Sequence, residues 1–153
     1  MKNLLIVYHS QSGTNARLMQ AAYDGALQES EVETRLLRAS EANTEDLLWA
    51  DAVIFGSPEN FGYLSGGLTD FLARTFYPYQ HHAPNRNLAY ALVVGTGNDG
   101  SGAIRQLQRI VRGYPMREAA EAIIVRGEIQ AADLLRCEEL GLTMAAGLAL
   151  GIF

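Results

Sequence analysis

A short stretch near the start of the chain combines hydroxyl, amide and glycine residues in a pattern typical of anion binding. It follows the apolar run 4–8 and consists of Ser10, Gln11, Ser12, Gly13, Thr14 and Asn15. A helical pattern begins at its end, and a helix N-terminus presents free N–H groups and a positive dipole end. No Lys or Arg occurs between residues 3 and 16, so we expect neutral donors alone to hold the anion. This suits the phosphate monoester of a bound cofactor.

Two further loops with ligand-binding character follow apolar runs later in the chain. Residues 56–63 contain Pro58, Phe61 and Tyr63 beside two glycines, so a flat ring could lie against them. Residues 95–102 include four glycines, and a backbone without side chains can approach a ligand closely. Glu59 is the one ionisable residue of the first of these loops, and we expect it to be an exposed carboxylate that could also bond a ligand.

The elements that must position these loops follow from hydrophobic periodicity. Apolar runs alternate five times with helical patterns, which predicts an α/β fold with a parallel sheet. We expect strands at 3–8, 32–38, 52–55, 88–94 and 122–125, and helices at 15–28, 44–49, 64–77 and 131–148, with a further helix ending at 113–115. Right-handed crossovers bring the three loops to the carboxyl edge of the sheet, where ligands of such folds bind. A phosphate cradle, a flat-ring wall and a tight polar wall at one edge describe a site for flavin mononucleotide (FMN).

Length and composition bound the remaining possibilities. The 153 residues predict one domain spanning 1–153, and 48% hydrophobic with 19% charged residues is typical of a globular chain. A net charge of −5 disfavours nucleic acid as a partner, and no apolar run is long enough to span a membrane. The start lacks a signal-peptide pattern, so we expect a cytoplasmic protein. The sequence leaves a homo-oligomer open.

Histidine and cysteine do not suggest further chemistry. His81 and His82 are expected in a solvated loop at the opposite edge of the sheet, without a carboxylate or cysteine at metal-ligand spacing. His9 is interpreted as a structural histidine beside the first loop. Cys137 is alone and lies on the apolar face of the last helix, so we expect a core residue. No metal site and no covalent catalytic side chain are predicted.

Two of the loops resemble motifs of the flavodoxin-like superfamily, specifically its flavodoxin and NAD(P)H-dependent FMN reductase branches. Residues 10–15 are similar to the family phosphate loop, except that Asn15 stands where the family has Thr, and we expect Asn15 to cap the helix instead. Residues 56–66 resemble the loop that wraps the isoalloxazine ring in the reductase branch. The resemblance covers nearly the whole chain. It implies a three-layer sandwich with a five-stranded parallel sheet in the order 2-1-3-4-5.

Three other interpretations of these loops are weaker. Residues 95–100 match the dinucleotide pattern G-x-G-x-x-G, but only one strand follows them, whereas that fingerprint belongs to the first strand of its unit. A response regulator needs an acidic pocket after the first strand, which residues 8–10 lack. A cysteine phosphatase needs a cysteine in the phosphate loop, and the one cysteine is Cys137.

The predicted site therefore holds FMN, with backbone N–H groups of 59–62 facing the ring and those of 96–99 its pyrimidine edge. Its cofactor-binding residues are Ser10, Gln11, Ser12, Gly13, Thr14, Asn15, Pro58, Glu59, Asn60, Phe61, Gly62, Thr96, Gly97, Asn98, Asp99 and Gly102. One hypothesis is an oxidoreductase in which NAD(P)H reduces the flavin, which then reduces a quinone, a free flavin or another acceptor. The alternative is a flavodoxin-type electron carrier that serves a redox protein. A third is a protein of this fold without useful flavin affinity. The modest charge and the absence of an aromatic residue in 95–102 favour the reductase.

Overall fold

The computed structural model describes all residues, 1–153, and contains seven strands and five helices. Their bounds are β1 Lys2–Tyr8, α1 Thr14–Ala26, β2 Val32–Arg38, α2 Thr44–Trp49, β3 Ala52–Asn60, β4 Tyr63–Leu64, α3 Gly66–His82, β5 Leu88–Thr96, α4 Ser101–Val111, β6 Met116–Glu118, β7 Ile123–Arg126 and α5 Ala131–Ala149. The buried strands β1 and β5 are continuous apolar runs, as expected for strands covered on both faces.

The central sheet is parallel, with the order β2-β1-β3-β5-β6, and β7 also pairs with β5. This confirms the predicted order 2-1-3-4-5, because β6 and β7 together occupy the last position. β6 pairs with the start of β5 at Leu88–Tyr90, and β7 pairs with its end at Val93–Thr96. β6 was not predicted, because three residues of mixed polarity carry too little periodicity to stand out.

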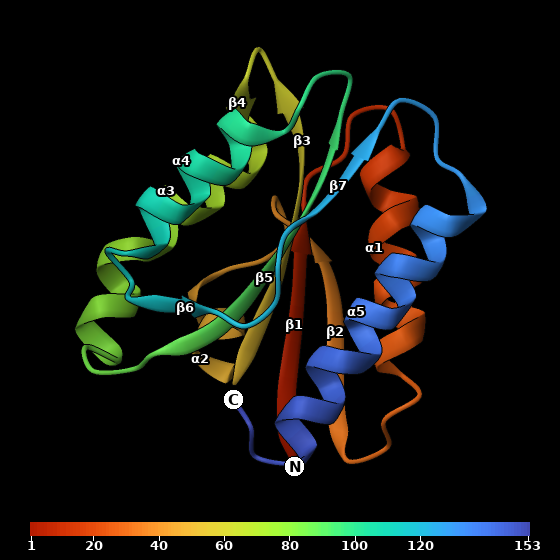
Figure 1. Ribbon diagram of the computed structural model, residues 1–153. Helices are drawn as coiled ribbons and strands as arrows, with labels where there is room; N and C mark the ends of the chain where they lie inside the picture. The colour runs from red at the N-terminus through yellow and green to blue at the C-terminus, as the bar shows by residue number, and fades with distance from the viewer.

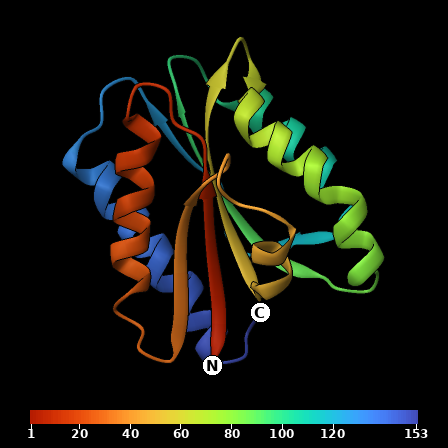
Figure 2. The same ribbon diagram turned by 180° about the vertical axis from the view of Figure 1, so that it is seen from behind.

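Helices cover both faces of the sheet. Figure 1 shows α1 and α5 on one face and α2, α3 and α4 on the other, and Figure 2 shows the same layers from behind. Each face has its own apolar core, one of 22 and one of 20 buried residues. Cys137 is fully buried in the core under α1 and α5, as predicted, and burial raises the pKa of its thiol to about 11. Both chain ends lie at the amino edge of the sheet, opposite the candidate site (Figure 1). No helix combines the length and apolar character needed to cross a bilayer.

Helix α3 is longer than predicted. It continues through Pro78 to His82, so His81 and His82 belong to its exposed last turn and not to a loop. Proline removes one helical hydrogen bond. The next residue, Tyr79, is fully buried, and its ring centroid lies 5.6 Å from that of Tyr114. This packing offsets the lost hydrogen bond, so the helix continues past Pro78.

The second predicted loop is instead a β-hairpin. β3 continues to Asn60, turns at Phe61 and Gly62, and pairs antiparallel with β4. Both turn residues have positive φ, 53° and 75°, as a two-residue hairpin turn requires. Phe61 is 97% exposed at the tip. The expectation of an irregular loop failed because Phe-Gly is not one of the usual hairpin turn pairs.

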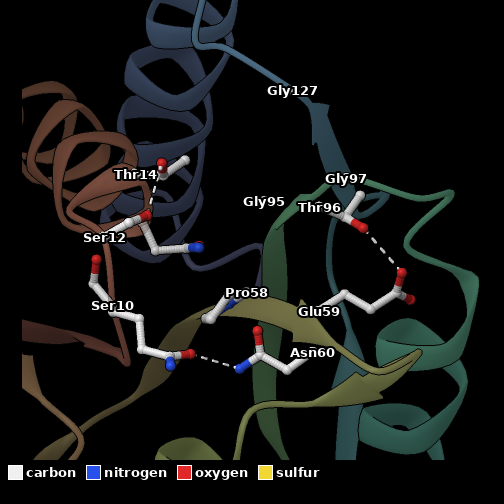
Figure 3. A pocket seen from close by; sticks show the side chains of 12 residues that line it. Ser10, Ser12, Thr14, Pro58, Glu59, Asn60, Gly95, Thr96, Gly97 and Gly127 are labelled. Atoms are coloured by element: carbon white, nitrogen blue, oxygen red, sulfur yellow. Dashed lines mark hydrogen bonds between the residues drawn. The ribbon is translucent and has the colours of Figure 1, made fainter.

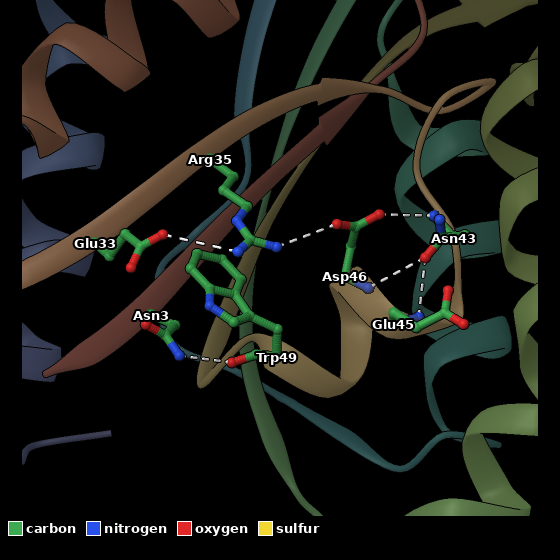
Figure 4. Close-up of polar contacts among 7 residues, drawn as sticks. All are labelled: Asn3, Glu33, Arg35, Asn43, Glu45, Asp46 and Trp49. Atoms are coloured by element: carbon green, nitrogen blue, oxygen red, sulfur yellow. Dashed lines mark hydrogen bonds and ion pairs between the residues drawn. The ribbon is translucent and has the colours of Figure 1, made fainter.

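Polar contacts fix α2 against the outer edge of the sheet (Figure 4). Asn43 caps α2 by accepting from the N–H groups of Glu45 and Asp46. The Arg35 guanidinium of β2 lies 3.8 Å from the Trp49 ring centroid and 3.4 Å from an Asp46 carboxylate oxygen. These contacts keep the edge strand β2, and the loop that follows it, in place beside β1.

Candidate functional site

The three predicted loops meet in one pocket of about 250 Å³ at the carboxyl edge of the sheet. Figure 3 shows side chains from all three loops around it. Its lining consists of Ser10, Gln11, Ser12, Thr14, Asn15, Pro58, Glu59, Asn60, Gly95, Thr96, Gly97 and Gly127. Apart from Pro58 every lining residue is polar or glycine, so the pocket suits a ligand rich in hydrogen-bonding groups.

The phosphate loop, residues 10–15, presents unpaired donors to this pocket. Gly13 is the N-cap of α1 with φ 96°, and no side chain caps the helix. The Gly13 N–H donates to Ser10 Oγ at 3.2 Å, but the N–H groups of Thr14 and Asn15 have no protein acceptor. The hydroxyls of Ser12 and Thr14 lie 3.4 Å apart above them. This is the donor arrangement that binds a phosphate at a helix N-terminus.

Asn15 does not cap α1, contrary to expectation. It lies in the first turn of the helix, is 2% exposed, and lines the pocket. Its Oδ1 is buried and has no hydrogen-bond partner in the protein. Its side chain also packs so closely on Gly95 that a Cβ there would lie 3.0 Å from Asn15 Nδ2. An unpartnered buried oxygen in a pocket wall indicates a place for a ligand donor.

A cation lies closer to the phosphate loop than the sequence suggested. Arg38 ends β2, directly beside Tyr8 in the sheet register, and its guanidinium donates to the Ser10 carbonyl oxygen at 3.5 Å. Arg38 does not line the pocket, so the expectation that neutral donors alone hold the anion stays a prediction. It considered only residues near the loop in sequence, whereas parallel pairing brings the end of β2 next to the end of β1.

Glu59 is not an exposed loop carboxylate. One oxygen accepts from Thr96 Oγ1 at 2.9 Å and from the Gly100 N–H at 3.2 Å. The other accepts from the N–H groups of Gly102 and Ala103 at 3.1 and 3.2 Å. The carboxylate thus occupies the N-terminus of α4, where the helix dipole favours a negative charge. We call Glu59 with these four donor residues the Glu59 bracket; it ties the hairpin to the third loop.

Six predicted site residues do not line the pocket: Gly13, Phe61, Gly62, Asn98, Asp99 and Gly102. Phe61 projects into solvent at the hairpin tip. Gly62 and Gly102 pack on each other, since a Cβ on Gly102 would lie 1.8 Å from the Gly62 carbonyl oxygen. Part of the backbone of 59–60 pairs with β4 instead of facing the pocket.

The third loop satisfies several of its own polar groups. The Asn98 N–H donates to Thr96 Oγ1 at 2.8 Å. Asp99 accepts from the Ser101 N–H and hydroxyl at 2.9 and 2.8 Å, and these bonds lower the pKa of its carboxyl. Only the N–H groups of Gly97 and Asp99 lack a protein acceptor in residues 97–100. The third loop therefore has fewer backbone N–H groups free for a ligand than predicted.

Two pocket residues were missed, Gly95 and Gly127. Gly95 belongs to the end of β5 and faces α1, and Gly127 follows β7. A glycine directly after the last predicted strand was a usable signal for Gly127, because every strand end of a parallel sheet meets the same edge.

A further hydrogen bond closes the opposite side of the pocket, where Asn60 Nδ2 donates to Gln11 Oε1 at 2.8 Å (Figure 3).

The residues present fit the phosphate and ribityl end of FMN. Free N–H groups, two hydroxyls and a nearby guanidinium suit a phosphate, and the unpartnered Asn15 oxygen suits a hydroxyl donor. No group of three or more His, Cys, Asp or Glu residues is arranged to hold a metal ion. His9 packs its ring on Gly67 beside the site and not within it.

The fold and this site define a flavodoxin-like protein with a polar pocket at the carboxyl edge of its sheet. A flavodoxin from the domain Archaea has the same fold, with a TM-score of 0.80 and 19% identity over 96% of this chain and 99% of that one. The family model of the NADPH-dependent FMN reductases matches residues 38–129. The chain belongs to the NADPH-dependent FMN reductase family, and is an FMN-binding flavodoxin-like protein.

Curated relatives come from both functional branches. A flavodoxin of Aquifex aeolicus (strain VF5) is 34% identical over 71 residues, which is 46% of this chain and 38% of the relative. An NAD(P)H dehydrogenase (quinone) of Acidithiobacillus ferrooxidans (strain ATCC 53993 / BNL-5-31) is 30% identical over 95 residues, 49% of this chain and 48% of the relative. The chain thus spans less than half the length of these relatives.

Proposed function

We propose that the protein is an FMN-dependent oxidoreductase that accepts electrons from NAD(P)H and passes them to a quinone, a free flavin or another small acceptor. FMN supplies the redox chemistry when bound, since it can exchange electrons with both a nicotinamide and an acceptor. The protein supplies binding, orientation and electrostatics through the residues described next.

The phosphate loop would hold the phosphate of the cofactor. The N–H groups of Thr14 and Asn15 and the hydroxyls of Ser12 and Thr14 would donate to it, and Arg38 would add positive charge from β2. Donors fixed by the backbone need no rearrangement on binding, so the loop contributes affinity at a low cost in entropy.

Residues of the other two strand ends would position the ring. Pro58 and Asn60 form one wall, and Gly97 with its free N–H forms the other. The free N–H group on this wall would stabilise negative charge on a bound flavin ring. Both carboxylate oxygens of Glu59 accept from protein donors, so the Glu59 bracket holds these two walls at a fixed separation and has a positioning role.

The observation that carries the proposal is the open third loop. Gly97 has no atom within 4 Å of the position that a Cβ would occupy, and no aromatic side chain stands in residues 97–100. A ring bound beside this loop keeps one face accessible to a nicotinamide. An electron carrier does not need such access.

The electron-carrier alternative rests on a different observation. Of the two curated relatives described above, the one with the higher identity is the flavodoxin, although its match covers 46% of this chain against 49% for the quinone dehydrogenase. In that case the protein would exchange electrons with a redox protein and would not react with NAD(P)H.

Anaerobic mixing separates the two functions. The protein is purified, loaded with FMN, and mixed with NADPH or NADH while the flavin absorbance is followed. We expect rapid bleaching that is restored by a quinone. If nicotinamides leave the absorbance unchanged while dithionite bleaches it, the carrier function replaces the reductase.

A further inference from the structure

A second groove lies on the outer side of the hairpin, apart from the FMN pocket. It has a volume of about 570 Å³ and is lined by Gly62, Tyr63, Gly102, Arg105, Gln106, Gln108, Arg109 and Arg112. The volume falls within the range of small-molecule sites. Three arginines, an aromatic ring and two glutamines are the residue types that bind a phosphorylated base, and none of these side chains lines the FMN pocket.

The three arginines have no anionic partner in the protein. Ion pairs occupy Arg35, Arg74, Arg86 and Arg136, but none forms at Arg105, Arg109 or Arg112. Residues 101–111 of α4 contain no Asp or Glu at all. In a chain of net charge −5, this is a local excess of unpaired positive charge.

Most of this charge has no structural benefit for α4. Arg105 and Arg109 are spaced i, i+4, so they face each other and repel. Arg109 at least lies in the last turn, where the helix dipole favours a cation. Arg105 lies one turn earlier and gains nothing from the dipole. A bound anion would remove the repulsion, which is the physical reason to look for one.

The other walls of the groove suit an adenine better than a protein surface. Tyr63 is 64% exposed and presents a free ring for stacking. Gln106 is committed to the Leu64 N–H at 2.6 Å, whereas the Gln108 amide has no protein partner and is available to a base edge. A concave groove with one stacking ring favours a small ligand over the flat, extended contact of an acidic protein.

The groove and the FMN pocket share a wall. Gly102 lines the groove, and a Cβ there would lie 3.3 Å from the Glu59 oxygen whose carboxylate lines the pocket. The hairpin borders both, with Glu59 and Asn60 on the pocket and Gly62 and Tyr63 on the groove. A ligand with phosphates at one end and a reacting ring at the other could therefore occupy the groove and reach over the tip into the pocket.

We propose that the groove binds the adenosine phosphates of NADPH, with Arg105 and Arg109 recognising its 2′-phosphate through charge-assisted hydrogen bonds. The inference rests on the proposed reductase function and gives it a specificity: NADPH in preference to NADH. Arginine suits this task because its planar donors match phosphate oxygens in pairs.

The test uses the full chain and a redox-inert probe, 2′,5′-ADP, compared with 5′-ADP by isothermal titration calorimetry. We expect the wild type to bind 2′,5′-ADP about tenfold more tightly than 5′-ADP, and the double variant Arg105→Gln/Arg109→Gln to lose this difference. Arg117→Gln is the matched control, because Arg117 is also exposed and unpaired but lies outside the groove. The same double variant should raise the KM for NADPH about tenfold while kcat is retained.

The possible outcomes distinguish failure of the groove assignment from failure of the proposed reductase function. If the double variant binds 2′,5′-ADP like the wild type, or if the wild type binds neither probe, the groove assignment is overturned. Binding of poly-glutamate with no binding of 2′,5′-ADP would also overturn it, in favour of an acidic protein partner. If binding of 2′,5′-ADP depends on the arginines but neither nicotinamide reduces the flavin, the groove stands and the reductase function fails.

Discussion

The phosphate loop and the Glu59 bracket lie at the same edge of the sheet but differ in whether their polar groups have hydrogen-bond partners within the protein. In the phosphate loop the N–H groups of Thr14 and Asn15 and the buried Asn15 oxygen have no protein partner. In the bracket the carboxylate of Glu59 receives four donors from the third loop and α4. One region is incomplete without a ligand, and the other is complete without one. The difference separates residues that bind from residues that position.

Removal of the Glu59 charge should have the largest effect on stability. Glu59→Gln keeps the size of the side chain but turns an NH₂ group toward two N–H donors, so we expect the free energy of unfolding to fall by about 2 kcal/mol. Urea denaturation measures it. Glu121→Gln, at an exposed glutamate, should change it by less than about 0.5 kcal/mol. A loss at Glu59 no larger than at Glu121 would contradict the positioning role.

Removal of the Asn15 amide should weaken FMN binding without lowering the stability of the protein, unlike the change at Glu59. Because Oδ1 has no partner in the free protein, Asn15→Ala should leave the stability of the FMN-free protein unchanged or slightly raised. The Kd for FMN should rise about tenfold, because the ligand loses a buried partner. Fluorescence titration with FMN and urea denaturation of the same sample measure both. A protein that loses stability but not affinity would make Asn15 a structural residue.

The hairpin tip should tolerate a change that the bracket does not. Phe61 holds a positive φ that Asn adopts more readily, and Asn-Gly is the favoured pair for this turn, so Phe61→Asn should stabilise the protein by about 0.5 kcal/mol. FMN affinity should stay within about twofold, because the ring of Phe61 is in solvent. A large loss of affinity would show that the tip closes over the ligand.

The smallest effect concerns Asp99 in the third loop. Hydrogen bonds from Ser101 lower the pKa of the Asp99 carboxyl, so Asp99 stabilises the fold above its unfolded pKa and loses that contribution as the pH falls through the lower folded value. Ser101→Ala removes the hydroxyl donor but keeps the N–H donor, so it should raise the pKa of Asp99 only part of the way toward its ordinary value, as followed by carboxyl NMR. Ser40→Ala, at an exposed serine far along the chain, should leave the Asp99 titration as in the wild type.

Much of the architecture was predictable because it depends on local patterns. The continuous apolar runs of β1 and β5 predicted buried parallel strands, and the order of the sheet followed from the resemblance. The meeting of three loops at one edge then followed from the rule for strand ends. The partners of individual polar groups were not predictable in this way. Glu59 accepts hydrogen bonds from residues about forty positions later in the chain, and Arg38 reaches Ser10 because β2 pairs with β1. Neither contact can be recognised from the residues that surround Glu59 or Arg38 in the sequence.

Two errors have a common physical origin. The hairpin at Phe61 and Gly62 and the continuation of α3 through Pro78 both oppose local preference. In each case tertiary packing overrides it: the hairpin is held by the bracket and by Gln106, and α3 by burial of Tyr79. The sequence indicated where the loops lie, but the packing decided their conformation.

The measurement that tests the account most directly compares FMN with riboflavin, which lacks the phosphate. If the free donors of the phosphate loop hold that group, the FMN-free protein should bind FMN about a hundredfold more tightly than riboflavin, because each charge-assisted bond contributes substantially. Equal affinity for the two flavins, or no binding of either, would contradict the assignment of residues 10–15 as the phosphate site.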